Sequence, residues 1–168
     1  MNDFVGGTTV SKGNLGAHRT SVLILIDVQD YFLDKYPWRE QLVEAVANQI
    51  RRAILRHEWI VRVEMKGFGE TIDSLMKELE GYDRCIEVKK TTPSGAAEVL
   101  ARAAQLDMAF DIVKVCGVYK NMCVKATVLG LWRKLKNREI LVINEACDPG
   151  PFVKDWDKAF REGGVVAV

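Results

Sequence analysis

Histidine is scarce in this sequence: among its 168 residues, only His18 and His57 are histidines. Its four cysteines are dispersed, and no two of them form a C-x-x-C pair. Structural zinc sites need clustered Cys and His ligands, and disulfide scaffolds need many closely placed cysteines. Neither class of site fits this chain. We therefore expect no metal, reduced thiols and a cytoplasmic location.

Long apolar runs and a bias of charge are also absent. No stretch approaches the roughly 20 apolar residues of a membrane span, and the first part of the chain has no apolar signal-peptide core. Lysine plus arginine number 24 against 23 aspartate plus glutamate, a formal net charge of +1. This balance gives no reason to expect a nucleic acid or a membrane as a partner.

What the sequence does contain is an alternation of buried-strand and amphipathic-helix patterns. The run SVLILIDVQ (21–29) is typical of a buried strand, and the apolar positions of 39–57 recur at fourfold spacing. Ser94 is a suitable N-cap for an alanine-rich helix. Strands are predicted over 21–29, 59–65, 84–89, 110–118, 138–146 and 165–168. Helices are predicted over 39–57, 70–81, 94–106, 121–137 and 153–164.

Strands that alternate with helices form a parallel sheet covered on both faces. We predict one doubly wound α/β domain over residues 21–168, with a mostly parallel six-stranded sheet and helices on both faces. Residues 1–20, rich in Gly, Thr, Ser and Asn, form an N-terminal arm in this prediction. Ligands of such folds bind beyond the carboxyl ends of the strands, so functional side chains should follow strands.

Three side chains meet that criterion: Asp27, Lys90 and Cys123. Each also has a plain structural interpretation. Asp27 could satisfy backbone donors at a strand end, Lys90 could be solvated, and Cys123 could be a small buried hydrophobic residue. A thiol near the start of a helix, however, lies close to unpaired N–H groups and the positive end of the helix dipole, which favour a thiolate.

Three segments together match a known family. LILIDVQDYFLD (23–34) has Asp, then Gln two residues on and Phe three further on; KKTTPSG (89–95) has Lys followed by Ser; VCGVYKNMCVKAT (115–127) has Gly-Val, then Cys, then Thr. In this order and spacing, the chain resembles the isochorismatase-like cysteine hydrolases. These include nicotinamidases and N-carbamoylsarcosine amidases. The resemblance extends over about residues 21–148.

The resemblance implies an Asp-Lys-Cys triad, here Asp27, Lys90 and Cys123. It implies hydrolysis of an amide or ureido C–N bond in a small-molecule substrate, through an acyl-thioester and without a cofactor. Cys123 would attack the carbonyl carbon and Asp27 would transfer the proton. Lys90 would lower the pKa of both neighbours. Most relatives are homo-oligomers, so we expect a dimer or a larger assembly.

The resemblance also implies a cis peptide bond between Val118 and Tyr119, with the backbone N–H groups of Tyr119 and Cys123 as the oxyanion hole. The loop after the first strand borders the site in relatives. Phe32 and Tyr31, together with Tyr119, are therefore expected to line the substrate pocket. Trp38 is expected either in this pocket or at a subunit contact.

Some positions depart from the family pattern. Residues 63–74 contain none of the histidines that hold the metal of metal-dependent nicotinamidases. Ala96 replaces a common aromatic residue and should reshape the pocket. Tyr119 and Lys120 place a ring and a charge near the entrance. Glu145 is expected to close the fifth strand in place of Asp.

Alternatives to an amide hydrolase remain open. Isochorismatase itself cleaves a vinyl ether without a cysteine nucleophile, so Cys123 argues against that activity. A catalytically silent binding or oligomer-building module is compatible with the altered pocket. A nucleotide-binding domain lacks a glycine-rich phosphate loop. Cys85 and Cys116 are expected to be inert within strands, whereas Cys147, after the fifth strand, is expected to be partly exposed.

Overall fold

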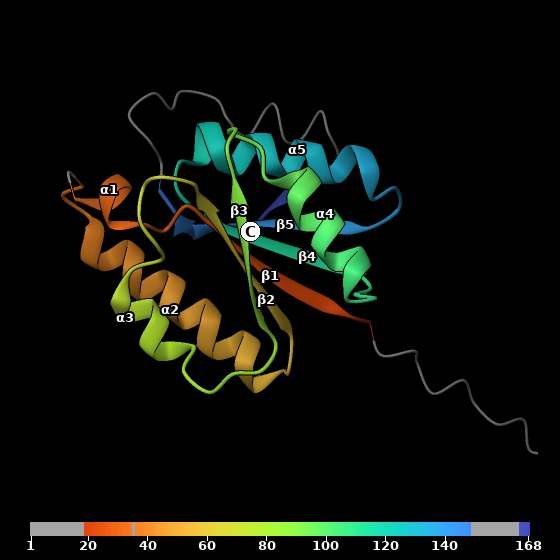
Figure 1. Ribbon diagram of the computed structural model, residues 1–168, viewed down its shortest axis with the longest axis horizontal. Coiled ribbons are helices and arrows are strands. Elements are labelled where there is room, and N and C mark those ends of the chain that lie inside the picture. The colour runs from red at the N-terminus through yellow and green to blue at the C-terminus, as the bar shows by residue number, and fades with distance from the viewer. Residues whose placement is uncertain (1–18, 35, 149–164) are drawn as a thin grey trace, which may run out of the picture.

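The computed structural model describes residues 19–34, 36–148 and 165–168. Six strands form one sheet in the order β3-β2-β1-β4-β5-β6, and every neighbouring pair is parallel (Figure 1). The strands are β1 (Ser21–Ile26), β2 (Trp59–Met65), β3 (Cys85–Lys90), β4 (Ile112–Gly117), β5 (Glu139–Cys147) and β6 (Val166–Ala167). The helices are α1 (Asp30–Leu33), α2 (Arg39–Leu55), α3 (Asp73–Glu78), α4 (Ala96–Gln105) and α5 (Lys125–Lys134), with a π-helical turn η1 (Lys120–Val124) before α5.

Helices cover both faces of the sheet. Helices α2 and α3 lie together on one face, and α4 and α5 lie together on the other (Figure 1). Strand β1 lies in the middle, and Val22 to Ile26 are buried because they are covered from both sides. The predicted doubly wound α/β domain with a parallel six-stranded sheet is confirmed.

Helix α2 shows why the spacing of apolar residues predicts a helix. Leu42, Val46 and Ile50 are buried against the sheet, and their fourfold spacing puts them on one side of the helix. No helix among the described residues is both long and apolar enough to cross a bilayer.

The predicted boundaries differ from the structure at several places. The first strand ends at Ile26 because Asp27 takes a positive φ of 50°. The helix predicted over 70–81 is reduced to Asp73–Glu78, since Thr71 is extended and pairs with Gln29 in an antiparallel bridge. The short helix α1 was not predicted. The helix predicted over 153–164 lies outside the described residues, as does nearly all of the predicted arm.

Strands β1 and β4 are neighbours whose following helices lie on opposite faces. From β1 the chain continues through α2 to β2 on one side of the sheet, and from β4 it continues through α5 to β5 on the other side. The direction in which strands are added therefore reverses between β1 and β4. Ile26 at the end of β1 pairs with Gly117 at the end of β4. Such a switch point is where open α/β sheets bind ligands.

Candidate active site

Asp27 occupies the first position after β1, at this switch point. Its left-handed backbone is uncommon for a residue with a side chain, although Asp tolerates it better than most. Its N–H donates to the Val63 carbonyl at 2.8 Å, which ties the turn to β2. The carboxyl is 1% exposed, so a nearby cation has a large effect on its charge.

Lys90 is the last residue of β3 and supplies that cation. Its Nζ lies 2.8 Å from Oδ2 of Asp27, and its side chain has no exposed surface. The ammonium also donates to the carbonyl oxygens of Thr92 and Pro93, each at 3.2 Å. Lys90 thus combines an ion pair with Asp27 and hydrogen bonds to two backbone carbonyls.

Cys123 lies in η1 rather than in an α-helix. The N–H of Val124 donates to the carbonyl of Tyr119 at 3.1 Å, the spacing of a π-helix. Such turns are rare and occur frequently at functional sites. The thiol is buried and within hydrogen-bonding reach of the Asp27 carboxyl. The structure thus brings Asp27, Lys90 and Cys123 together.

The turn before Cys123 is fixed by a close approach of two strands. Gly117 has a φ of 124°, and a Cβ built there would lie 2.1 Å from the Ile26 carbonyl oxygen. No side chain fits at this position. The next peptide bond but one, between Val118 and Tyr119, is cis. The N–H groups of Val118 and Lys120 donate to Ile26 at 2.8 Å and Asp148 at 3.3 Å.

Burial is the largest influence on the pKa values of Asp27 and Cys123. Desolvation raises the pKa of Asp27 above its ordinary value, against the hydrogen bonds from Lys90 and Cys123 that lower it. Burial, together with the neighbouring Asp27, raises the pKa of Cys123 to about 11, although Lys90 acts in the opposite direction. Lys90 lowers the pKa of both neighbours, as expected, but burial and Asp27 outweigh it at Cys123, so the net shift does not favour a thiolate. At neutral pH the proton stays on sulfur.

A buried hydrogen bond joins the Lys90 segment to the Cys123 segment. The N–H of Gly95 donates to Oγ1 of Thr127 at 3.0 Å, and both residues are buried. A Cβ on Gly95 would lie 3.2 Å from Cδ of Lys90. Thr127 and Gly95 thus fix where Lys90 lies relative to the turn that carries Cys123.

Aromatic rings gather beside the triad. The ring centroid of Phe32 lies 5.2 Å from those of Tyr31 and Phe68, and 5.8 Å from that of Tyr119. The rings of Tyr31 and Phe68 are 4.6 Å apart. The three residues predicted to line the pocket therefore belong to one cluster. Phe68 was missed, although two glycines with positive φ, Gly67 and Gly69, flank it.

Gln29 holds the loop that carries Phe68. Its amide nitrogen donates to the carbonyls of Met65 at 3.1 Å and Gly69 at 2.7 Å, while its Oε1 accepts from the Met65 N–H at 2.9 Å. Glu64, also buried, accepts from both the N–H and the hydroxyl of Thr71, at 2.9 and 2.7 Å. The loop after β2 is thus tied down by two buried polar side chains.

The structure corrects expectations for residues that depart from the family pattern near the site. Ala96 packs against α5, where a Cβ on Gly130 would lie 2.6 Å from its own. Lys120 is buried rather than at the entrance, and its charge lowers the pKa of Cys147. Strand β5 continues to Cys147, so the acid that follows it is the buried Asp148, and Glu145 lies within the strand.

The other cysteines differ from Cys123 in their surroundings. Cys147 was expected to be partly exposed but is buried, because β5 extends that far, and burial raises its pKa to about 12. Burial raises the pKa of Cys116 well above its ordinary value and that of Cys85 to a smaller extent. The charged neighbours of Cys123 are Asp27 and Lys90, whereas those of Cys85 are Arg62 and Glu64 and those of Cys147 are Lys120 and Asp148.

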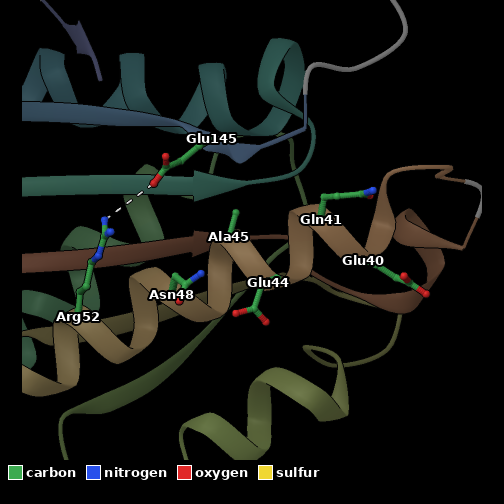
Figure 2. Close-up of a pocket in the computed structure, with 7 residues that line it drawn as sticks. All are labelled: Glu40, Gln41, Glu44, Ala45, Asn48, Arg52 and Glu145. Carbon is green, nitrogen blue, oxygen red and sulfur yellow. Dashed lines mark ion pairs between the residues drawn. The ribbon is translucent and has the colours of Figure 1, made fainter.

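A cavity of about 590 Å³ lies elsewhere, along α2. Figure 2 shows its side chains, which come from α2 and, in the case of Glu145, from β5. Glu145 and Arg52 form an ion pair of 3.9 Å across it. Its lining is mainly exposed polar side chains and includes none of Asp27, Lys90 and Cys123.

The loop after β2 does not fit the metal of the metal-dependent relatives. It has no histidine; Gln29 binds its backbone, and Phe68 packs in the aromatic cluster. In the described ranges, no three or more His, Cys, Asp or Glu side chains form a group that could hold a metal ion.

The sequence pattern of the isochorismatase domain matches residues 21–162. The chain belongs to this family. Comparison with curated protein sequences finds no match. Asp27, Lys90 and Cys123 all lie within the residues matched.

Solved structures of the same fold bear different activities. The nicotinamidase of Staphylococcus aureus is 12% identical, with a TM-score of 0.72 over 90% of this chain and 100% of that one. The N-carbamoylsarcosine amidase of Thermoplasma acidophilum is 18% identical, with a TM-score of 0.73 over 88% of this chain and 95% of that one. The MAR1 ribonuclease of Caenorhabditis elegans is 18% identical, with a TM-score of 0.70 over 88% and 75%. At these identities the likeness shows the fold, and function must be inferred from the site.

Proposed function

We propose that this protein is a cysteine-dependent hydrolase of an amide or ureido C–N bond in a small molecule, with Asp27, Lys90 and Cys123 as its triad. The family match and the similarity to a nicotinamidase and an N-carbamoylsarcosine amidase support a hydrolase acting on C–N bonds. The observation that carries the proposal is the thiol of Cys123 beside the Asp27 carboxyl, which Lys90 contacts at 2.8 Å.

The first half of the reaction forms an acyl-thioester. Asp27 takes the thiol proton as Cys123 Sγ attacks the carbonyl carbon, because the thiol is protonated at neutral pH. The N–H groups of Tyr119 and Cys123 are our proposed donors to the oxyanion. Asp27 then gives the proton to the leaving nitrogen, the C–N bond breaks and the amine departs.

The second half regenerates the enzyme. A water molecule attacks the thioester carbon, and Asp27 accepts its proton. The C–S bond breaks, Cys123 recovers its proton, and a carboxylic acid leaves. A carboxyl with a raised pKa suits this alternation of base and acid. Lys90 keeps the carboxylate oriented and compensates its charge between steps.

A panel of small carboxamides and ureido compounds tests the proposal. Ammonia or amine release is measured with the wild-type chain, with Cys123→Ala, and with Cys85→Ala as a matched cysteine control on the far end of β3. We expect release by the wild type and Cys85→Ala, and a loss of at least about a thousandfold in Cys123→Ala. Equal release by Cys123→Ala would contradict the mechanism. Absence of hydrolysis across the panel would favour a binding module.

A further inference from the structure

Another cavity lies at the opposite end of the sheet from the triad. Its volume is about 460 Å³, and its walls come from the starts of β1 and β2, the residue before β3 and the end of α2. Asp27, Lys90 and Cys123 instead follow or end strands, and a strand of this length spans about 20 Å. The cavity is therefore separate from the candidate active site.

The lining of this cavity is rich in arginine. Arg19, Arg56 and Arg84 all contribute to it. Arg19 pairs with Glu139 at 3.0 Å. Within the described part of the chain, however, neither Arg56 nor Arg84 forms an ion pair. Asp83, the neighbour of Arg84 in sequence, does not line the cavity. Two guanidinium charges are thus left without a carboxylate partner.

Among the described residues that line the cavity, Glu58 alone is acidic, and it carries its own counter-ion. Both of its carboxylate oxygens accept from the ammonium of Lys114, at 2.6 and 2.7 Å. Arg56 is the C-cap of α2 and so meets the negative end of the helix dipole, but that end amounts to only about half an elementary charge. The excess of positive charge therefore remains, and a cleft concentrates its field on an incoming anion.

Arg84 is held in place by the chain between α2 and β2. Its Nη1 donates to the His57 carbonyl at 2.8 Å. The hydroxyl of Tyr82 donates to the carbonyl of Glu58 at 2.5 Å, which fastens the same segment a second time. The guanidinium of Arg84 therefore lies against the residue that follows Arg56. Its remaining N–H groups form a planar fork that matches two oxygens of a phosphate.

The cavity also has room and an apolar surface for an organic group. Its volume is that of an ordinary small-molecule site. Trp59, the first residue of β2, lines it and is only partly buried, so its indole offers a flat apolar face beside the arginines.

We propose that this cavity binds the phosphate group of a small organic phosphate, with Arg56 and Arg84 as the residues that contact it. A phosphomonoester carries about −1.5 to −2 charges at neutral pH, which two guanidinium groups compensate. Hydrogen bonds between charged partners of this kind are stronger than those between neutral ones. The proposal does not rest on the proposed function, since binding here involves no residue of the triad.

Isothermal titration calorimetry in a phosphate-free buffer of low ionic strength tests the site. The probes are AMP and ribose 5-phosphate, which share a phosphate, and adenosine, which lacks one. We expect both phosphates to bind with a dissociation constant below about 1 mM and adenosine to give no measurable binding.

Arg84→Gln and Arg56→Gln each remove one of the two charges, and each should weaken both phosphates at least about tenfold. Arg133→Gln is the matched control, because this exposed arginine in the last turn of α5 does not line the cavity. It changes the net charge equally and should leave the dissociation constants unchanged. Thermal unfolding checks that each variant is folded, and Arg56→Gln serves if the Arg84 variant is not.

Three results would each overturn the phosphate site: neither phosphate binds at millimolar concentration, adenosine binds as tightly as AMP, or Arg133→Gln loses as much affinity as the cavity variants. The last result would mean a general attraction of anions to the whole chain. None of these measurements needs turnover, so failure of this site and failure of the proposed hydrolase are told apart.

Discussion

The ammonium of Lys90 lies 2.8 Å from the Asp27 carboxylate, and the exposed fraction of neither side chain exceeds 2%. Both charges are out of water and compensate each other. In a buried pair of this kind, loss of one partner leaves the other uncompensated, which is far more costly than loss of a surface pair.

Lys90→Met should therefore destabilise the protein by about 3 kcal/mol at neutral pH. Lys89→Met is the matched control, because its side chain is 44% exposed and its ion pairs should contribute less than about 1 kcal/mol. Without Lys90, the pKa of Asp27 rises further, so the folded state binds an extra proton. The destabilisation should shrink as pH falls. Urea denaturation measures both variants, and equal losses would contradict the pairing.

The pH dependence of hydrolysis follows from the two raised pKa values. The rate constant kcat/KM needs Asp27 as a carboxylate and a proton on Cys123. Activity should rise as pH increases through the Asp27 pKa, above its ordinary 3.8, and decline only towards the thiol pKa of about 11. A profile of kcat/KM against pH checks this. A decline centred near about pH 8.5, where an ordinary thiol titrates, would contradict the buried-thiol account.

Gly117→Ala should be strongly destabilising because its Cβ would lie 2.1 Å from the Ile26 carbonyl oxygen. Gly81→Ala is the control: Gly81 also has a positive φ, but no atom lies within 4 Å of its built Cβ. The control should lose only the conformational cost of about 1 kcal/mol, and Gly117→Ala at least about 2 kcal/mol more. Chemical denaturation compares them, and equal losses would show that β4 can move away from β1.

Thr127→Val removes the acceptor of the Gly95 N–H and leaves that buried donor unsatisfied, at a cost of about 1–3 kcal/mol. Because Gly95 packs on Lys90, we expect kcat to fall by roughly tenfold with little change in KM. Thr127→Ser keeps the hydroxyl and should restore kcat. If serine and valine have the same kcat, the hydroxyl plays no part in positioning Lys90.

Much of this arrangement could be predicted from the sequence. Strand β1 is a continuous apolar run, and α2 repeats its apolar residues every fourth position. This alternation of strand and helix patterns predicted the sheet. This fold predicts functional side chains after the strands, which indicated Asp27 after β1, Lys90 at the end of β3 and Cys123 after β4. The structure brings these three together.

The remaining features depend on contacts that the linear pattern does not encode. Phe68 joins the aromatic cluster because the side chain of Gln29, far away in sequence, binds its loop. The prediction that Cys147 is partly exposed was wrong. Strand β5 extends to that residue past an irregularity in its pairing with β4. The high pKa of Cys123 reflects burial, which no local pattern around a helix start shows.

The rate of Cys123 alkylation by iodoacetamide as a function of pH, compared between the wild type and Asp27→Asn, tests the triad most directly. Asp27 raises the thiol pKa and Lys90 lowers it. Removing the carboxylate should therefore shift the alkylation midpoint below about 11 and accelerate labelling near neutral pH, while hydrolysis is lost. If the two profiles coincide, Asp27 does not act on Cys123, and the triad as described is wrong.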